Sequence, residues 1–403
     1  MPSGHVPLVS RVLTIAPTPF FGDRGCHVRI YEEVRALGRV GVDSLVVTYP
    51  GGNDLSDVRI RRSMALPGVR ASALGPSWSR PLLDATLVGT VLRTIRAWKP
   101  HVLHAHLHEG AFIGSLARGL TGLPVVADLQ GSLTEELIDH NVLRKQGVLT
   151  AAARRFERWL VSRPDVLLVS SAAAAGLVAD ANAPSHRVVA LPDGADLDVF
   201  RPMPRDAALA RSLRLEGRRV VGFLGVLTPY QGVDALLDAV PLVLAGVPDA
   251  HFLIMGYPNE DRYRDEARRR GLAEVTTFPG RIPYAEAPTY LALADVAVSP
   301  KQSLTEANGK LLNYMACGLA TVATDTPVNR ELLGSLGRYA PVGNVPALAN
   351  ALIDLLQNPD KRVAAGAALR ARVEQEFSWA ALARKLSGVY DRVFEATNRG
   401  ATT

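Results

Sequence analysis

The chain has 403 residues, of which 48% are hydrophobic and 21% charged, and its formal net charge is +6. This length exceeds what one hydrophobic core usually supports, so we expect two domains of roughly 200 residues. The basic residues are scattered, which gives no argument for nucleic acid. No apolar stretch of about 18 residues and no signal-like start occurs, so we expect a cytoplasmic protein. Cys26 and Cys317 are too few for a disulfide framework or a zinc site.

Short apolar runs bounded by turn residues alternate with segments long enough for a helix, a pattern typical of parallel βαβ units. The first series of expected strands covers residues 11–16, 44–48, 102–105, 125–127, 166–170 and 188–191. A turn-rich linker is expected at residues 192–202. The second series covers residues 220–224, 251–255, 275–278, 296–299 and 321–323. The sequence therefore predicts two open α/β sheets, with ligands outside the carboxyl ends of their strands.

The loops that follow the first strand of each series exclude several common enzyme classes. Residues 17–25 and 225–232 both lack the G-x-G-x-x-G pattern of dinucleotide-binding domains. Neither a P-loop nor a nucleophile elbow occurs elsewhere in the chain. These absences disfavour a nicotinamide-dependent enzyme and the simplest kinases, ATPases and hydrolases.

Two basic segments are expected to form helices. The first covers residues 82–99, and the second carries Arg154, Arg155, Arg158 and Arg163 around Phe156 and Trp159. Solvated helix faces are the favoured interpretation of both segments. Weak peripheral contact with an anionic membrane is the alternative.

A polar loop, a short helix, a glycine stop and a buried strand follow one another between residues 303 and 328. Asn308 and Gly309 open this helix, Lys310 lies in its first turn, and Gly318 ends it. The start of a helix leaves N–H groups without partners and carries partial positive charge, so an anion is expected there. An ordinary surface helix cap is the alternative.

Several segments, in order and over nearly the whole chain, resemble the retaining GT-B glycosyltransferases of glycosyltransferase family 4. The resemblance rests on residues 21–29 (FGDRGCHVR), 102–106 (VLHAH), 191–196 (LPDGAD), 290–296 (YLALADV) and 314–322 (YMACGLATV). The donor-binding positions depart from the family pattern. Thr305 and Asn313 stand where the family has glutamates, and Val226 and Gln231 stand where it has Arg and Lys.

The resemblance implies two Rossmann-like parallel-sheet domains that face a central cleft. It places an acceptor domain at 1–195, a nucleotide-sugar donor domain at 196–376, and a C-terminal helix at 377–403 that packs back on the first domain. It implies transfer of a sugar from a nucleotide-diphosphate-sugar to a glycan, lipid or small-molecule acceptor, with retention of configuration. Neither a cofactor nor a metal is expected.

The resemblance and the strand ends together suggest the site residues. His106 is expected to bind the reacting sugar as the catalytic residue, with a structural histidine as the alternative. His104, His106 and His108 are expected to converge without Cys or Asp partners at metal-binding spacing. Asp128 and Gln130 are expected to contact the acceptor. The expected donor-binding residues are Gly25, Arg29, Gly225, Gln231, Asn308, Gly309, Lys310 and Asn313, with Lys310 replacing the two missing cations.

Two other functions remain open because of the altered donor positions. A GT-B protein without transfer activity could serve as a binding or regulatory subunit. A sugar-nucleotide epimerase or a phosphorylase could use the same architecture. Binding of a nucleotide separates a transferase from a protein that has lost its donor site.

Overall fold

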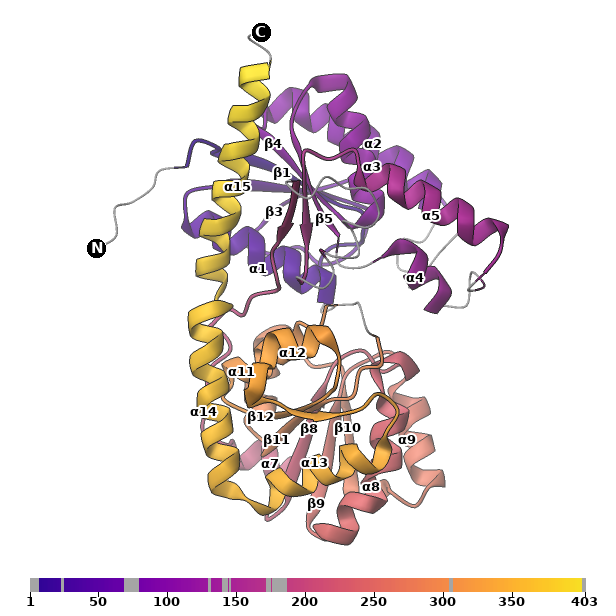
Figure 1. The fold of residues 1–403 in the computed structure, drawn as a ribbon, viewed down its shortest axis with the longest axis vertical. Helices are drawn as coiled ribbons and strands as arrows, with labels where there is room; N and C mark the ends of the chain where they lie inside the picture. The colour runs from indigo at the N-terminus through magenta and orange to yellow at the C-terminus, as the bar shows by residue number, and fades with distance from the viewer. Residues whose placement is uncertain are drawn as a thin grey trace, which may run out of the picture. The chain divides into compact units, whose positions relative to one another are not determined.

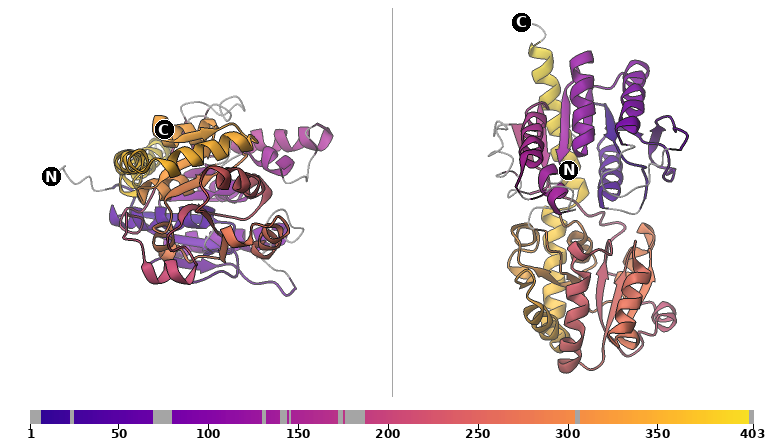
Figure 2. Two further views of the ribbon diagram at one scale, coloured as in Figure 1. Left: turned by 90° about the horizontal axis from the view of Figure 1, so that it is seen from below. Right: turned by 90° about the vertical axis from the view of Figure 1, so that its right-hand side faces the viewer.

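The computed structural model describes residues 7–22, 25–68, 80–129, 132–139, 144, 146–171, 175, 187–303 and 307–400 (Figures 1 and 2). These residues form two compact units. The first comprises Met1–Gly22, Cys26–Pro192 and Trp379–Thr403, and the second comprises Asp23–Gly25 and Asp193–Ser378. No helix in the described ranges is both long enough and apolar enough to cross a lipid bilayer.

The first unit contains a seven-stranded parallel sheet with the order β3-β2-β1-β4-β5-β6-β7. Its strands are β1 (Arg11–Ala16), β2 (Asp43–Thr48), β3 (Arg59–Arg62), β4 (Val102–His106), β5 (Val125–Leu129), β6 (Val166–Val169) and β7 (Val188–Ala190). The central strands are buried on both faces, which explains why their sequences are almost continuously apolar.

Helices cover both faces of this sheet. They are α1 (Gly25–Arg39), α2 (Arg80–Trp98), α3 (Leu107–Thr121), α4 (Leu133–Asp139), α5 (Val148–Val161) and α15 (Trp379–Gly400). Val12 of β1 packs in a cluster with α1 and α15, whereas its neighbour Leu13 packs in a cluster with α2 and α3. Successive residues of a strand point to opposite faces, so one apolar strand serves both clusters.

The second unit repeats this plan with a six-stranded parallel sheet in the order β10-β9-β8-β11-β12-β13. Its strands are β8 (Arg219–Leu224), β9 (Ala250–Met255), β10 (Thr276–Gly280), β11 (Val296–Ser299), β12 (Ala320–Thr324) and β13 (Arg338–Ala340). In both sheets the strand order is that of a doubly wound Rossmann-like fold. The predicted pair of α/β domains with parallel sheets is confirmed.

The helices of the second unit also lie on both faces of its sheet. They are α7 (Ala207–Ser212), α8 (Val233–Gly246), α9 (Glu260–Arg269), α10 (Ala287–Leu291), α11 (Lys310–Ala316), α12 (Pro327–Leu333), α13 (Val345–Gln357) and α14 (Pro359–Glu376). Short 3₁₀ turns lie at Pro229–Gln231, Ala273–Val275, Tyr284–Glu286 and Gly334–Leu336. One apolar cluster joins α8 and α13 to the sheet, and another joins α11 and α14 to its opposite face.

The structure differs from the sequence-based expectation at the sheet edges and at the domain borders. The edge strands β3 and β13 were not expected, because both are short and β3 is partly solvated and reads RIRR. Apart from Asp23–Gly25, the chain passes between the units at residues 192/193 and 378/379, where borders at 195/196 and 376/377 were expected. Ala195 and Phe200 are buried in the core of the second unit, so the expected linker belongs largely to that unit.

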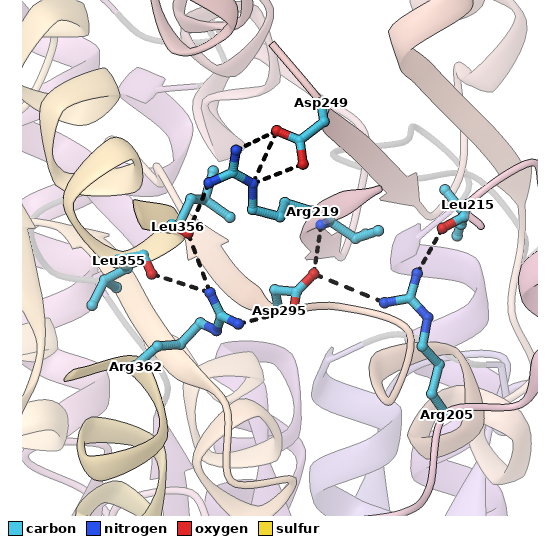
Figure 3. A network of polar contacts seen from close by, with 9 residues as sticks. Arg205, Leu215, Arg219, Asp249, Asp295, Leu355, Leu356 and Arg362 are labelled. Carbon is cyan, nitrogen blue, oxygen red and sulfur yellow. Dashed lines mark hydrogen bonds and ion pairs between the residues drawn. The ribbon is translucent and has the colours of Figure 1, made fainter. Parts of the chain in front are cut away.

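A polar network holds the amino ends of the strands in the second unit (Figure 3). The carboxylate of Asp295, just before β11, accepts a hydrogen bond of 2.8 Å from the N–H of Val220 in β8. It also forms an ion pair of 3.3 Å with Arg362, while Arg219 pairs with Asp249. These charged side chains therefore make structural contacts at the amino edge of the sheet. Ligands of open α/β sheets bind at the opposite, carboxyl edge.

Candidate active site

The strand order reverses between β1 and β4 in the first unit and between β8 and β11 in the second. Crevices for ligands form outside the carboxyl ends of the strands at such switch points. His106 is the last residue of β4, and Gly225 directly follows β8. Each unit therefore has predicted site residues at its own switch point.

The first of these two places holds a buried cluster of ionisable side chains. Arg29 and Glu33 come from α1, and because they are four residues apart they lie on the same face of that helix. His106 of β4 lies directly across the sheet from Asp128 of β5. His104, two residues before His106, points to the same face. Arg29 is 3% exposed, and the other four are completely buried.

Short contacts connect the members of this cluster. His106 Nδ1 lies 3.3 Å from Asp128 Oδ2, and His106 Nε2 lies 3.6 Å from Glu33 Oε1. Glu33 Oε1 is also 3.0 Å from His104 Nδ1. Arg29 donates from Nε to Asp128 Oδ2 at 2.7 Å and from Nη2 to the carbonyl of Leu191 at 3.0 Å. The cluster therefore ties α1, β4 and β5 together inside the unit.

The C-terminal helix α15 completes the cluster. The hydroxyl of Tyr390 lies 2.7 Å from Nδ1 of His104. Near the start of the same helix, the indole N–H of Trp379 donates to Glu32, and the Arg29 guanidinium lies 5.9 Å from the Trp379 ring centroid. The helix expected to return to the first domain is thus in contact with the predicted site residues of that unit.

Burial and neighbouring charges oppose one another in setting the pKa values of the cluster. Burial alone lowers the pKa of His106, but its contacts with Asp128 and Glu33 outweigh burial and raise the pKa to about 9. Burial raises the pKa of Glu33, yet the adjacent histidines bring it well below its usual range. Burial likewise raises the pKa of Asp128, and Arg29 and His106 lower it. The stable arrangement at neutral pH is an imidazolium at His106 between two carboxylates.

Four members of the cluster are also close enough to hold a metal ion. One ligand atom each from Glu33, His104, His106 and Asp128 lie within 4.8 Å of one another in the described part of the chain. The expectation that the histidines lack an acidic partner at metal-binding spacing was therefore wrong. Arg29 and His106 are positive partners of the Asp128 carboxylate inside the same cluster, and Glu33 lies beside both histidines.

The raised pKa of His106 predicts a loss of stability in alkaline solution. Its unfolded-state pKa is about 6.5, so its contribution is complete below that pH and is lost as the pH rises through about 9. The depressed pKa values of Glu33 and Asp128 act at the other end, where stability is lost as the pH falls below their usual values. Urea unfolding of the wild type and of His106→Gln across this range measures the effect. A difference between the two curves that does not shrink above about pH 9 would contradict it.

The second place holds the ammonium group of Lys310. The Lys310 side chain reaches from the first turn of α11 to Gln231, and its Nζ donates to Gln231 Oε1 at 2.5 Å. The same Nζ lies 4.5 Å from the centroid of the Phe223 ring, on β8. Lys310 therefore carries its positive charge to the carboxyl end of β8, beside the Gln231 position where the related family has a lysine.

Two glycines leave room for this arrangement. A Cβ added to Gly225 would lie 2.7 Å from Lys310 Nζ, so the absence of a side chain allows the ammonium to approach the backbone. Gly232, after Gln231, has a φ of +79°, and a Cβ there would lie 2.0 Å from the carbonyl oxygen of Pro300. Glycine tolerates both the close approach of another group and a positive φ without strain.

The residues at the start of α11 have close partners within the second unit. The buried amide of Asn308 donates to Asn329 Oδ1 at 2.8 Å and to Ser299 Oγ at 3.1 Å, which makes it a structural group rather than one open to a ligand. The Asp193 carboxylate lies against Gly309, where a Cβ would be 2.7 Å from its Oδ2. Asp193 therefore lies close to this helix start, and the anion expected there stays a prediction.

The half-buried Asn313 lies one turn after Lys310 on the same helix, and no hydrogen bond joins its side chain to the described residues. Contact between Asn313 and the bound sugar donor stays a prediction. Gly25 is the first residue of α1. Gln130 lies outside the described residues.

The ligand-binding roles expected for Arg29, His106 and Asp128 stay predictions, and the structure adds contacts among the three side chains. Their side chains are buried and engage one another, so each has a structural partner. Sequence reasoning missed Glu33 and Tyr390. The four-residue spacing of Arg29 and Glu33 was the available signal for the first, whereas no local pattern connects Tyr390 with His104, which lies 286 positions away.

Two family models match the chain. The model described as "Glycosyl transferase 4-like domain" matches residues 24–194, and "Glycosyl transferases group 1" matches residues 218–358. A phosphatidyl-myo-inositol mannosyltransferase of Mycobacterium tuberculosis is 30% identical over 315 residues, or 75% of this chain and 77% of the relative. A D-inositol 3-phosphate glycosyltransferase of Thermobispora bispora is 27% identical over 97% of this chain and 96% of its own.

Solved structures agree on the fold. Sucrose-phosphate synthase from Thermosynechococcus elongatus matches with a TM-score of 0.80 at 18% identity, covering 96% of this chain and all 100% of that one. Anabaena HepE, solved with UDP and glucose, matches with a TM-score of 0.76 at 18% identity, covering 94% of this chain and 99% of its own. With the two Rossmann-like units and both family models in place, the chain belongs to glycosyltransferase family 4 and has its GT-B fold.

Proposed function

We propose that this glycosyltransferase takes its sugar from a nucleotide-diphosphate-sugar and transfers it with retention of anomeric configuration, without a metal. The observation that carries the donor assignment is the ammonium of Lys310 at the carboxyl end of β8. It is held by Gln231, Gly225 and Phe223 at the switch point of a Rossmann-like sheet. A fixed cation at that edge suits the diphosphate of a donor.

Lys310 supplies charge where the related family uses other residues. Hydrogen bonds to charged groups contribute about 1.5–3 kcal/mol each, so a diphosphate site without the family's Arg and Lys needs a substitute. Lys310 donates to Gln231, and its flexible stem allows it to turn to a phosphate oxygen. Asn313, on the same helix, offers both an acceptor and two donors to ribose hydroxyl groups.

The proposed reaction needs few groups from the protein. The bond between the anomeric carbon and the phosphate oxygen breaks, and a bond to the acceptor oxygen forms on the same face of the sugar. The acceptor hydroxyl proton passes to the departing phosphate oxygen, and the nucleoside diphosphate leaves. Lys310 stabilises the negative charge that develops on the leaving group.

The acceptor class follows from the relatives rather than from the geometry. The names of both relatives contain inositol, once in a phospholipid and once as a phosphate. We therefore propose a polyhydroxylated acceptor of this kind as the first to test, with other glycans, lipids and small molecules as the comparison set.

A ligand screen followed by a transfer assay tests this function. We expect UDP, GDP or ADP, or one of their sugars, to raise the melting temperature. With that donor and an acceptor, mass spectrometry should detect a glycosylated product whose yield is unchanged by EDTA. The coupling constant of its anomeric proton should match that of the donor sugar.

Other outcomes distinguish the alternatives. Absence of binding to every nucleoside diphosphate and sugar nucleotide would leave a non-catalytic GT-B protein. Conversion of the sugar nucleotide without an acceptor would identify an epimerase, and a requirement for inorganic phosphate would identify a phosphorylase. Loss of activity in EDTA that is restored by a divalent cation would contradict the metal-independent mechanism.

A further inference from the structure

The first unit carries an exposed apolar surface that its fold does not use. Helices α3 and α5 lie side by side (Figure 1). Their large exposed apolar side chains are Phe112, Leu116 and Leu120 on α3 and Val148, Leu149, Phe156 and Trp159 on α5, which we call the α3–α5 surface. Leu149 is 72% exposed and Leu120 is 66% exposed. Large apolar side chains that are exposed to water on two adjacent helices indicate an interaction surface.

Aromatic contacts make this surface continuous from one helix to the other. The rings of Phe156 and Trp159 stack with centroids 5.7 Å apart. The ring of Phe112 lies 6.4 Å from that of Phe156 and 6.3 Å from that of Trp159. On α3, Phe112, Leu116 and Leu120 follow at intervals of four residues and so share one face.

The charge around the aromatic rings has a single sign on α5. All exposed charged side chains of this helix are arginines, namely Arg154, Arg155 and Arg158. Arg163, just after the helix, lies with its guanidinium 4.8 Å from the centroid of the Trp159 ring. The one acidic residue of α5, Glu157, is turned inward, where it accepts hydrogen bonds from Leu133 and Thr134.

We propose that the α3–α5 surface docks on a lipid bilayer that contains anionic lipids. Aromatic and leucine side chains next to arginines on a surface helix match the two requirements of interfacial binding, apolar insertion and attraction to headgroups. Tryptophan is also favoured where an apolar region meets water. Docking of this surface on a bilayer is separate from sugar transfer and does not depend on the identity of the donor.

A second copy of the chain fits this surface less well. A two-fold interface brings the same patch of both subunits together. The arginines of α5 would then face one another, in a chain whose net charge is already +6. An anionic bilayer instead supplies the opposite charge to all of them.

Sedimentation of the full chain with vesicles tests this docking. We expect binding to vesicles of phosphatidylcholine mixed with phosphatidylglycerol and at least about tenfold weaker binding to phosphatidylcholine alone. Arg155→Glu with Arg158→Glu, and separately Phe156→Ser with Trp159→Ser, should each weaken binding to the mixed vesicles by about tenfold or more. Both variants should bind a nucleoside diphosphate as the wild type does.

A matched variant on α2 controls for net charge. Arg93 and Arg96 are exposed on the same unit, and Arg93→Glu with Arg96→Glu makes the same change in charge away from the α3–α5 surface. This control should keep vesicle binding within about twofold of the wild type. In addition, lipids brominated in their acyl chains should quench the fluorescence of the wild type, and Trp159→Phe should abolish that quenching while retaining binding.

Three results would overturn the proposal. The first is the absence of binding to the mixed vesicles at low salt. The second is an equal loss of binding in the α2 control, which would show that net charge alone attracts the chain. The third is a dimer in analytical ultracentrifugation that the Phe156→Ser and Trp159→Ser variant converts to a monomer, which would make this surface a contact between copies.

Discussion

We expect replacement of Lys310 by alanine to weaken the binding of a nucleoside diphosphate at least tenfold, which is about 1.4 kcal/mol. The reason is that Lys310 is the cation that reaches Gln231 and Gly225 at the end of β8. The loss should be larger at low than at high salt, because the ions screen the attraction to the diphosphate. Isothermal titration calorimetry at two salt concentrations measures both effects.

Two further variants separate the charge of Lys310 from its packing. Lys310→Met keeps the apolar stem over the Phe223 ring and removes only the charge, so it should lose as much affinity as Lys310→Ala. Lys361→Ala removes an exposed lysine of α14 that pairs with Asp354, and should leave the affinity unchanged. If the wild type binds a nucleoside diphosphate and Lys310→Met binds it equally well, Lys310 does not replace the missing cations.

The second large effect is expected from the buried cluster of the first unit. His106→Ala should lower the free energy of unfolding by about 3 kcal/mol or more, because it leaves the Glu33 and Asp128 carboxylates buried without the imidazolium between them. In the double variant, Glu33→Gln removes one of these charges and should restore at least about 1 kcal/mol of the free energy of unfolding that His106→Ala loses. Urea unfolding of the two single variants and the double variant measures this coupling.

A nearby histidine provides the control, and activity separates structure from catalysis. His101→Ala, at a half-exposed position just before β4, should cost no more than about 1 kcal/mol. Additive effects of His106→Ala and Glu33→Gln would show that the cluster is not electrostatically coupled. If the double variant is stable but remains inactive, His106 also acts on the sugar, and recovered turnover would leave it a structural role alone.

The succession of strands along the chain was predictable because short-range patterns encode it. Buried parallel strands such as β1, β4 and β8 need continuous apolar runs, and the turns between them need glycine, proline and polar residues. The edge strand β3 escaped this reasoning because it is partly solvated and needs no such run. Edge strands are held by backbone hydrogen bonds to their neighbours, which local composition does not reveal.

The sequence by itself determined the two Rossmann-like units, the family, the positions of His106 and Gly225 at strand ends and that of Lys310 in the first turn of a helix. Only the tertiary structure decided which side chains meet there. Glu33 reaches His104 and His106 because α1 packs on the sheet, and Tyr390 reaches His104 across 286 residues because α15 belongs to the first unit. The contact of Lys310 with Gln231 likewise joins residues that are 79 positions apart. Burial, pairing and pKa depend on such long-range packing, whereas periodicity and motif spacing record only neighbours along the chain.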